Sequence, residues 1–580
     1  MKREEALVVF GDELPPQWRH FDTVVASKKL QAELEAHGCD FVDLGTLCGP
    51  GSIYEASALL EELSYMKMPG GTRIAKSFVY KGFELWWVHY ENLFRYFCLP
   101  FTQYKKLLEY LKNFRSVSVY RPPHKNLFFC YLEAHGKKMT MLEEPGFKGP
   151  SFLPFGVLLQ IVITLLSLPV LALQRRRTMV YTGDKFEKDK DYDFRMRFAY
   201  EELRKRGMPF VEFIRGIEPW RNVLQHAFVR RRPVVYAGGM VFVAHLFSIL
   251  SGGRTRTRRQ FGAHRFAAMT DADARFKSLV ATQYLLDVHE DVWAIRIMQW
   301  ILRVAGVKVA FIPAASPRSY HAVLGCKLNA IPTVGIMHGV QSRFYNVYDF
   351  MPGFDGEKTL SVDAFGVWSE WWRAYYTQFS NAYAPGQLHV SGPMRPLIKS
   401  ATTAPAGALA PLRALFVSEE VAVPHEVLPY LEELLGQTHI TLSLKFRPSR
   451  DGFEQWLLHN RPDILTRSNL TVLRGSMQTA VAGADVLVGC YSTGVLEALL
   501  QMKVPVYFRT KKWGDYYDLK DYDAAHTFFA EDPRELVEKI KNARSVPAPV
   551  LKDLQERYFG DPYQNGSAWV VDRLEEMLKG

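Results

Sequence analysis

The chain has 580 residues, of which 48% are hydrophobic and 23% are charged, and its formal net charge is +11. This length is too great for a single hydrophobic core and predicts two or more domains, while the composition excludes an intrinsically disordered protein. The positive charge favours an anionic partner, which could be a phosphorylated substrate, a membrane surface or nucleic acid.

The six cysteines and the opening stretch of the sequence indicate a reducing compartment. No two cysteines have CxxC spacing, so the sequence predicts neither a zinc site nor a disulfide framework. The opening stretch MKREEALVVFGDE runs from charged residues directly into a short apolar segment and lacks the apolar core of a signal peptide. We therefore expect buried thiols in a cytosolic protein.

The first strand expected along the chain is Ala6 to Phe10, and the turn Gly11-Asp12-Glu13 follows it. Short apolar strands and helices alternate to about Leu44, which is typical of a Rossmann-like half. GxGxxG is missing after the first strand, so dinucleotide binding is not expected there. Asp12 or Glu13, at the carboxyl end of this strand, could be a catalytic base that faces an interdomain cleft; the alternative is a loop carboxylate that caps a helix.

Two apolar runs with basic flanks follow in the N-terminal half. Phe152 to Leu173 is a run of 22 residues without a charge, and arginines stand at 175–177. Val234 to Leu250 is bracketed by arginines at 230–232 and between 254 and 259. We expect a membrane-facing surface, as a full span or as an anchor in the plane of an anionic membrane; the alternative is a buried helix. Nucleic-acid binding would interleave basic residues with exposed aromatics, so no nucleic-acid partner is expected.

The α/β pattern resumes beyond residue 300. Strands are expected at Val307 to Ile312, Pro332 to Met337, Asp363 to Trp368 and Leu388 to Ser391. His338 and Gly339 follow the second of these strands, so His338 would lie over the cleft at a carboxyl edge of the sheet. It could contact a donor phosphate or a leaving group, and the alternative is a structural histidine.

A second α/β domain is expected after residues 401–411, ATTAPAGALAP, which form the best linker of the chain. Its expected strands are Arg413 to Ser418, Thr441 to Phe446, Leu470 to Leu473, Asp485 to Gly489 and Val504 to Phe508.

Two strand ends of this second domain carry groups suited to a phosphate. Lys445 and Arg447 close one strand and could neutralise a diphosphate or a carboxylated sugar donor. Ser492-Thr493-Gly494 is a small polar turn before a helix, where backbone N–H groups can hold a phosphate, and Glu497 could reach a ribose hydroxyl. The alternatives are surface ion pairs for the cations, a helix N-cap for Ser492 and a solvated carboxylate for Glu497.

The order of four short motifs resembles the GT-B glycosyltransferases of bacterial surface and capsular polysaccharide biosynthesis. It is most similar to the group that holds the capsule sialyl- and Kdo-transferases and the CDP-glycerol glycerophosphotransferases. The motifs are MHG from Met337, SGPMRP from Ser391, LKFRPS from Leu444 and ADVLVGCYSTGVLEALLQMKVPVYF from Ala484. The resemblance covers about 307–540 and implies donor phosphate or cytidine contacts, with His338 in the cleft. The residues we expect in the donor site are Gly339, Lys445, Arg447, Ser449, Ser492, Thr493, Gly494 and Glu497.

The chain departs from the pattern of this group at two positions. Arg447-Pro448 stands where the group has a His-Pro pair, which leaves the leaving-group acid and the donor open. Gly489-Cys490-Tyr491 lacks the acidic residue that often precedes the tyrosine. The first 300 residues carry no motif of the group, so the acceptor is also open.

The resemblance implies an α/β fold with two Rossmann-like domains that face a cleft. We expect an N-terminal acceptor domain at 1–400, with an aromatic-rich, apolar and membrane-associating helical insertion at about 75–300. The linker 401–411, a nucleotide-sugar donor domain at 412–548 and a C-terminal helical segment at 549–580 would follow.

The activity that the resemblance implies is an inverting glycosyltransferase. Its donor would be a nucleotide sugar, with CMP-linked Kdo-like or sialic-acid-like sugars as first candidates, and its acceptor a lipid-linked or surface glycan of the capsule or lipopolysaccharide kind. The sequence lacks a convincing DxD motif, so we expect no metal and no cofactor. The expected location is the cytoplasmic face of the inner membrane, as a peripheral or monotopic protein.

Other functions and other bases remain open at this point. A glycerol- or ribitol-phosphate transferase shares the motif layout, a UDP-sugar 2-epimerase has the same paired domains, and a membrane scaffold could retain the fold without catalysis. For the general base, position favours Asp12 or Glu13, and the next candidates are Glu290 and Asp291 in HEDVW and His338.

Overall fold

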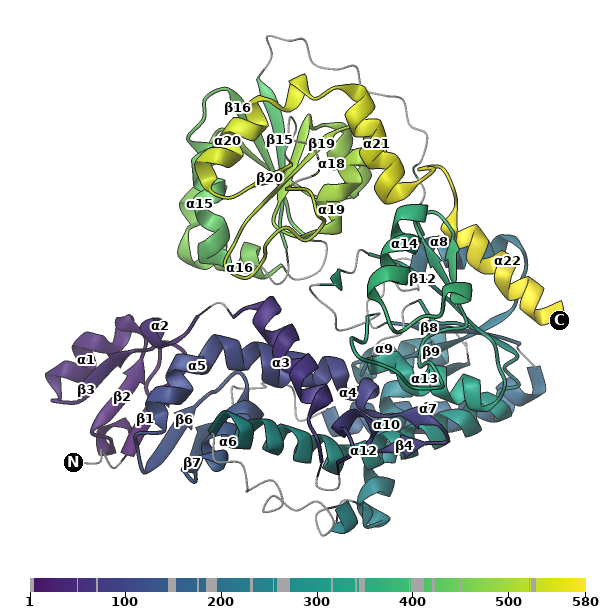
Figure 1. The fold of residues 1–580 in the computed structure, drawn as a ribbon, viewed down its shortest axis with the longest axis horizontal. Helices are drawn as coiled ribbons and strands as arrows, with labels where there is room; N and C mark the ends of the chain where they lie inside the picture. The colour runs from purple at the N-terminus through teal and green to yellow at the C-terminus, as the bar shows by residue number, and fades with distance from the viewer. Residues whose placement is uncertain are drawn as a thin grey trace.

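The computed structural model describes residues 5–579 with gaps, and it holds three parallel β-sheets flanked by helices (Figure 1). The α/β class expected from the sequence is confirmed. Ser449, most of the expected linker 401–411 and most arginines beside the two apolar runs lie outside the described residues. The gaps are 50, 69–70, 144–152, 175–176, 184–195, 230–232, 254, 258–271, 314–316, 340–341, 344–349, 396, 398–410, 420–422, 448–450, 521 and 523–527.

The first sheet is built near the N-terminus, and its central strand is buried on both faces. In β1 (Glu5–Val9), Ala6 and Val8 belong to the main hydrophobic core, whereas Leu7 and Val9 belong to a smaller cluster. The two-residue period of a strand places these pairs on opposite faces. The strand order is β3-β2-β1-β6-β7, all parallel. The other elements are β2 (Thr23–Ala26), α1 (Gln31–Ala36), β3 (Asp40–Asp43), α2 (Leu44–Leu47), α3 (Ile53–Tyr65), α4 (Trp86–Leu93), α5 (Leu99–Leu111), β6 (Ser116–Tyr120), α6 (Lys125–Ala134) and β7 (Lys138–Glu143), with a short antiparallel pair β4 (Val79–Tyr80) and β5 (Phe83–Glu84).

The second sheet has seven parallel strands in the order β10-β9-β8-β11-β12-β13-β14 and lies at the opposite end of the molecule from the N-terminal sheet in Figure 1; we call it the middle sheet for its place in the chain. Its first half comes from the segment that the sequence analysis assigned to an insertion. The elements are α7 (Leu153–Gln174), β8 (Thr178–Thr182), α8 (Arg197–Lys205), β9 (Phe210–Ile214), α9 (Trp220–Leu224), β10 (Val234–Tyr236), α10 (Ala237–Leu250), α12 (Ala272–Val304), β11 (Val309–Phe311), α13 (Pro317–Leu328), β12 (Thr333–Ile336), β13 (Ala364–Val367), α14 (Glu370–Phe379) and β14 (Leu388–Val390).

Residues 1–400 therefore hold two sheets, where the sequence analysis expected one N-terminal Rossmann-like domain. The difference arises because β11 pairs with β8, so Phe311 lies beside Val180 across more than a hundred residues of chain. A pairing over that separation leaves no local pattern in the sequence. The strand β10 is only three residues long and continues into the apolar helix α10, which hides it further.

The third sheet forms the C-terminal domain, and five of its strands lie where the sequence analysis expected them, whereas the two-residue strand β20 was not expected. Six parallel strands have the order β17-β16-β15-β18-β19-β20. The elements are β15 (Leu412–Val417), α15 (Pro424–Leu435), β16 (Ile440–Lys445), α16 (Gly452–Asn460), α17 (Pro462–Leu465), β17 (Leu470–Leu473), α18 (Met477–Ala482), β18 (Val486–Gly489), α19 (Thr493–Leu496), a 3-10 turn at Glu497–Gln501, β19 (Val504–Phe508), β20 (Phe529–Ala530) and α20 (Pro533–Lys541).

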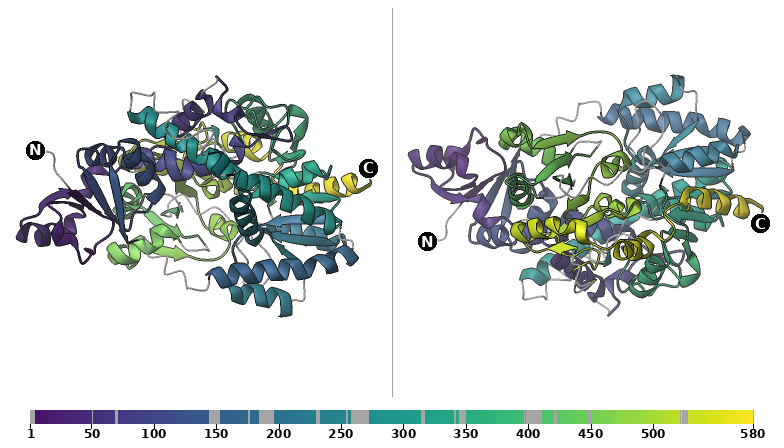
Figure 2. Two further views of the ribbon diagram at one scale, coloured as in Figure 1. Left: turned by 90° about the horizontal axis from the view of Figure 1, so that it is seen from below. Right: turned by 90° about the horizontal axis from the view of Figure 1, so that it is seen from above.

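The last two helices carry the chain back onto the middle domain. In α21 (Ala548–Phe559), the Tyr558 carbonyl accepts a hydrogen bond from Trp372 Nε1 of α14 at 2.9 Å. The final helix α22 (Gly566–Lys579) packs on α8 and on strands β11 to β13. Figure 2 shows the N-terminal sheet at one end of the molecule and α22 at the other. The expected helical segment 549–580 thus ties the C-terminal domain to the middle sheet.

Candidate functional site

The carboxyl edges of the middle and C-terminal sheets meet at two turns. His338 and Gly339 follow β12, and Ser492 and Thr493 follow β18. A Cβ atom built on Gly339 would lie 3.7 Å from Thr493 Oγ1. Carboxyl edges of parallel sheets are the usual place for ligand binding in open α/β folds. The structure therefore brings together two of the motifs that the sequence analysis singled out.

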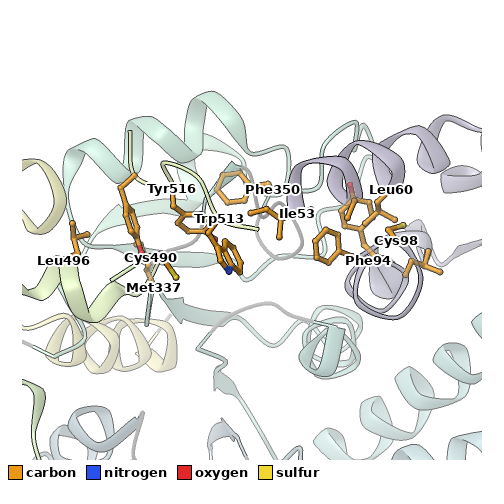
Figure 3. Packing of buried hydrophobic residues seen from close by; sticks show 14 of the residues in the cluster. Ile53, Leu60, Phe94, Cys98, Met337, Phe350, Cys490, Leu496, Trp513 and Tyr516 are labelled. Carbon is orange, nitrogen blue, oxygen red and sulfur yellow. The ribbon is translucent and has the colours of Figure 1, made fainter. Parts of the chain in front are cut away.

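Apolar packing continues beneath these turns. Met337, Cys490, Leu496 and Trp513 belong to the main core cluster, and Figure 3 shows them in one group that extends to Ile53 of α3. The two turns are thus anchored on buried residues from both domains, which limits their relative movement.

A buried carboxylate of the chain, Glu419, accepts hydrogen bonds from the backbone N–H groups of the turn after β18. The N–H groups of Cys490, Tyr491 and Ser492 donate to Glu419 Oε1 at 2.9, 3.0 and 2.9 Å, and Cys490 Sγ donates to Oε2 at 2.7 Å. Glu419 follows β15 and is 4% exposed. Burial raises its pKa, although the hydrogen bonds that it accepts oppose the shift. A phosphate at this turn would have to be held mainly by side chains, because Glu419 already takes these three N–H groups.

The hydroxyl of Ser492 has a local role in the same turn. Ser492 Oγ accepts from the Gly494 N–H at 3.1 Å and caps the short helix α19, which is the alternative that the sequence analysis left open. The Thr493 side chain hydrogen-bonds Tyr517 and is the hydroxyl that lies beside Gly339.

Tyrosines from the C-terminal domain fix the carbonyl groups of this turn. Tyr507 donates its hydroxyl to the Ser492 carbonyl at 2.9 Å, and Tyr517 donates to the Tyr491 carbonyl at 2.5 Å. The ring of Tyr491 stacks on Trp513 with ring centres 4.2 Å apart. The N–H groups and the carbonyl groups of the turn are therefore fixed by hydrogen bonds within the protein, as preorganised sites require.

Lys445 and Arg447 lie at the carboxyl end of β16. Lys445 is 6% exposed, donates from Nζ to the Phe446 carbonyl at 3.2 Å and forms no ion pair with a carboxylate among the described residues. Burial and the nearby charge of Arg474 lower its pKa. The backbone N–H of Arg447 donates to Asp451 Oδ2 at 3.0 Å, and the Asp451 carboxylate also caps α16. This strand end thus presents a desolvated ammonium group, and Arg447 follows it two residues along the chain.

Glu497 lies one turn along from Thr493 and is half-buried. Burial raises its pKa, and the positive charge of Arg395 opposes that shift. Arg395 belongs to the SGPMRP turn after β14 of the middle sheet. The pair is a second place where the edges of the two sheets come close.

The two carboxylates expected as catalytic bases lie on the N-terminal sheet. Asp12 pairs with Lys29 at 2.7 Å and Glu13 with Arg121 at 2.9 Å, and all four side chains are at least one-third exposed. The ion-pair partners of Asp12 and Glu13 both belong to the N-terminal region, and no contact of either carboxylate with the turns at Gly339 and Thr493 is seen among the described residues.

Glu290 and Asp291 have partners on helices. Glu290 Oε2 lies 2.7 Å from His245 Nδ1. Asp291 is buried between His89 and His321, with its Oδ1 2.8 Å from His321 Nε2. Burial alone would raise the pKa of Asp291, but the two histidines lower it to about 2. Both carboxylates therefore join helices.

Sequence reasoning missed Glu419, Arg395 and the tyrosines that hold the turn. A signal existed for the first two, because Ser418-Glu419 follows β15 as directly as Lys445 closes β16, and Arg395 stands inside a quoted motif. Tyr507 lies within a buried apolar strand, where nothing in the sequence separates it from core residues. Among the described residues, no group of three or more His, Cys, Asp or Glu side chains could hold a metal ion.

No protein-family model and no curated protein sequence matches the chain. Solved structures with a similar arrangement include a glycosyltransferase from Rickettsia africae, at 10% identity and a TM-score of 0.39, over 70% of this chain and 99% of that one. UDP-GlcNAc 2-epimerase from Neisseria meningitidis bound to UDP-GlcNAc has 10% identity and a TM-score of 0.37, over 70% and 100%. MurG from Acinetobacter baumannii has 12% identity and a TM-score of 0.38, over 69% and 99%. With TM-scores below 0.5, these likenesses decide neither the donor nor the reaction.

Proposed function

We propose that the protein is a glycosyltransferase that takes a nucleotide-sugar donor between the middle and C-terminal sheets. The observation that carries this proposal is the meeting of two strand-end turns, with Thr493 beside Gly339. Lys445 ends β16, which is separated from β18 by one strand of the C-terminal sheet, and it supplies a buried cation with no carboxylate partner among the described residues.

The donor phosphate is assigned to side chains of the C-terminal domain. Lys445 neutralises phosphate charge in a poorly hydrated place, where an ion pair is stronger than in water, and Arg447 adds bidentate contacts. Thr493 donates a hydroxyl, and Glu497 accepts from a ribose hydroxyl. Glu419 holds the turn in shape and does not touch the donor in this assignment.

The chemical step needs a base for the acceptor hydroxyl and stabilisation for the departing nucleotide phosphate. His338 lies in the first of the two meeting turns, and we assign it the proton transfer; Asp12 and Glu13 are the alternatives. His338→Gln should lower turnover by about 10²-fold or more with donor affinity retained. If Asp12→Asn or Glu13→Gln does so instead, the base belongs to the N-terminal sheet.

We assign the donor to the CMP-linked class and the reaction to inverting, metal-independent transfer onto a lipid-linked or surface glycan. Two cations at one strand end support the metal-independent part of this assignment, since they can neutralise a phosphate without a metal ion. Turnover that survives EDTA would agree with this assignment, and turnover that needs Mg²⁺ or Mn²⁺ would overturn it.

The test is a donor-hydrolysis screen with CMP-, CDP-, UDP- and GDP-linked compounds. We expect hydrolysis of a CMP-linked sugar by the wild-type protein and its loss in Lys445→Met. Release of polyol phosphate from a CDP-polyol would identify a polyol-phosphate transferase, and isomerisation of UDP-GlcNAc without hydrolysis an epimerase. No binding of any nucleotide would overturn the proposal and favour a scaffold.

A further inference from the structure

Helix α7 has one apolar face buried in the protein and a second apolar face exposed. The inner face includes Val157, Ile163, Leu168 and Leu171. The outer side chains recur every three or four residues, so they form one stripe along the helix. They are Phe155, Leu158, Val162, Leu165, Leu166, Val170 and Leu173, with Leu166 64% and Leu173 85% exposed. An outer helix of a water-exposed surface would carry polar residues on this stripe.

Two polar residues of α7, Gln160 and Thr164, are buried and form hydrogen bonds with the protein. Gln160 Nε2 donates to the Glu218 carbonyl at 3.0 Å, and Thr164 Oγ1 accepts from the Tyr236 N–H at 3.0 Å. α7 is the one helix among the described residues that is long and apolar enough to cross a membrane, yet 44% of that window is buried. It also contacts β10, α9 and α10. A helix that packs along one side against a β-sheet domain cannot be surrounded by lipid tails as a span is.

Helix α10 extends the same surface. It packs against α7, and a Cβ built on Gly239 would lie only 3.0 Å from Gln160 Cβ, so the glycine allows the close approach. Phe242, Leu246 and Leu250 are exposed on α10. Neither helix contains Asp, Glu, Lys or Arg. In Figure 1 the two helices lie on the side of the middle domain away from the C-terminal domain.

The segment of the chain that holds α10 is rich in arginine, and the described carboxylate of Glu290 pairs with His245 of α10. Residues 215–259 contain nine arginines and one carboxylate, and that carboxylate, Glu218, is 4% exposed and accepts from Asn222. Among the described arginines, Arg177 follows α7 and is exposed, and Arg221 lies over the Trp220 ring at 5.5 Å. An apolar face edged by arginine and tryptophan fits the headgroup region of an anionic bilayer.

We propose that α7 and α10 together dock the protein in the plane of an anionic membrane leaflet, and that α7 does not cross it. The proposal stands on this surface alone and does not depend on the reaction assigned above. The protein would then be a monotopic membrane protein, attached to one leaflet. A lipid-linked acceptor would be bound from the same leaflet.

The test is sedimentation of the full chain with vesicles of phosphatidylcholine alone and of phosphatidylcholine mixed with phosphatidylglycerol. We expect strong binding only to the anionic vesicles, weakened by salt. Leu158→Glu, Leu166→Glu, Leu173→Glu and Leu246→Glu should each weaken binding by roughly tenfold or more, because all four leucines enter the interface. Leu458→Glu is the matched control, since Leu458 is 53% exposed on α16, and it should bind like the wild type.

Three outcomes would overturn the proposal. The wild-type protein could fail to sediment with either vesicle. Only Leu166→Glu, in the second half of α7, could weaken binding while the variants at Leu158, Leu173 and Leu246 bind normally, which would indicate a span. The protein could also form a dimer that these glutamates dissociate, without any vesicle binding, which would make the face a contact between two copies. Equal unfolding midpoints for the variants and for Leu458→Glu show that folding is unaffected.

Discussion

At the residue scale, Glu419 decides how the turn after β18 can hold an anion. Its Oε1 accepts three backbone N–H groups, so the chain supplies internally the negative charge that the sequence pattern assigned to a phosphate. The sequence predicted the turn but not its partner, because Glu419 lies 71 residues before Cys490. Local patterns carry no information about an acceptor at that separation.

Removing the carboxylate should therefore damage the turn. Glu419→Ala leaves three buried N–H groups without an acceptor, and we expect a loss of about 3 kcal/mol or more of stability together with weaker donor binding. Glu419→Gln keeps one carbonyl oxygen in place and should cost less than half as much. Chemical unfolding and donor titration of both variants measure this; equal stability of Ala and Gln variants would contradict the role given to Oε1.

Lys445 offers a sharp test of the donor site, because the chain contains a matched control. Lys445→Met and Arg447→Ala should each weaken donor binding by about 2–4 kcal/mol, since each removes a charge-assisted contact to phosphate. Lys503 is also partly buried with a lowered pKa, but it lies at the amino end of β19. Lys503→Met should leave donor affinity unchanged. Equal losses from Lys445→Met and Lys503→Met in calorimetric titrations would show a general effect of charge, and the site would be misplaced.

At the scale of elements, a buried carboxylate connects three helices that flank two different sheets. Asp291 of α12 lies between His89 of α4 and His321 of α13. Burial lowers the pKa of His89, but the charge of Asp291 outweighs it and the net shift is upward; Asp287 and Glu290 add to this. The contact closes the N-terminal helices onto the middle domain.

The stability of this junction should depend on pH in a defined direction. The pKa of His89 is raised above 6.5 in the folded protein, so its contribution is full below pH 6.5 and is lost as the pH rises through the folded value. The pKa of Asp291 falls from 3.8 to about 2, so its contribution is full above pH 3.8 and is lost as the pH falls toward 2. Thermal unfolding midpoints should thus decline above pH 6.5. Asp291→Asn should cost about 3–5 kcal/mol and flatten the decline; an unchanged slope in that variant would contradict the assignment.

The elements that the sequence predicted well are those whose signal is local. The strands of the C-terminal sheet that the sequence predicted are short apolar runs, and their expected carboxyl ends at Phe446 and Gly489 lie within one residue of the observed ends at Lys445 and Gly489. The strands β8 to β10 were missed, because β10 merges with the apolar run of α10 and because its partners lie far along the chain. The apolar run of α7 predicted a membrane segment, but the inward hydrogen bonds of Gln160 and Thr164 could only be seen in the structure.

At the scale of the molecule, the C-terminal domain touches both other sheet domains. Its last helix α22 packs on the middle sheet, and a Cβ built on Gly514 would lie 2.7 Å from Tyr54 Oη of α3. Arg343, beyond Gly339, pairs with Asp518 at 3.6 Å. The helix α3 of the N-terminal region therefore lies against the domain that carries the turn after β18.

The most direct measurement of the central claim is amide hydrogen exchange of the full chain with and without saturating CMP, CDP, UDP and GDP. We expect slower amide hydrogen exchange with the bound nucleotide in peptides that cover 336–339, 442–447 and 489–497, and no change in the peptide 5–13. Protection confined to the N-terminal sheet, or nucleotide binding without protection at 442–447 and 489–497, would contradict the placement of the donor between the middle and C-terminal sheets.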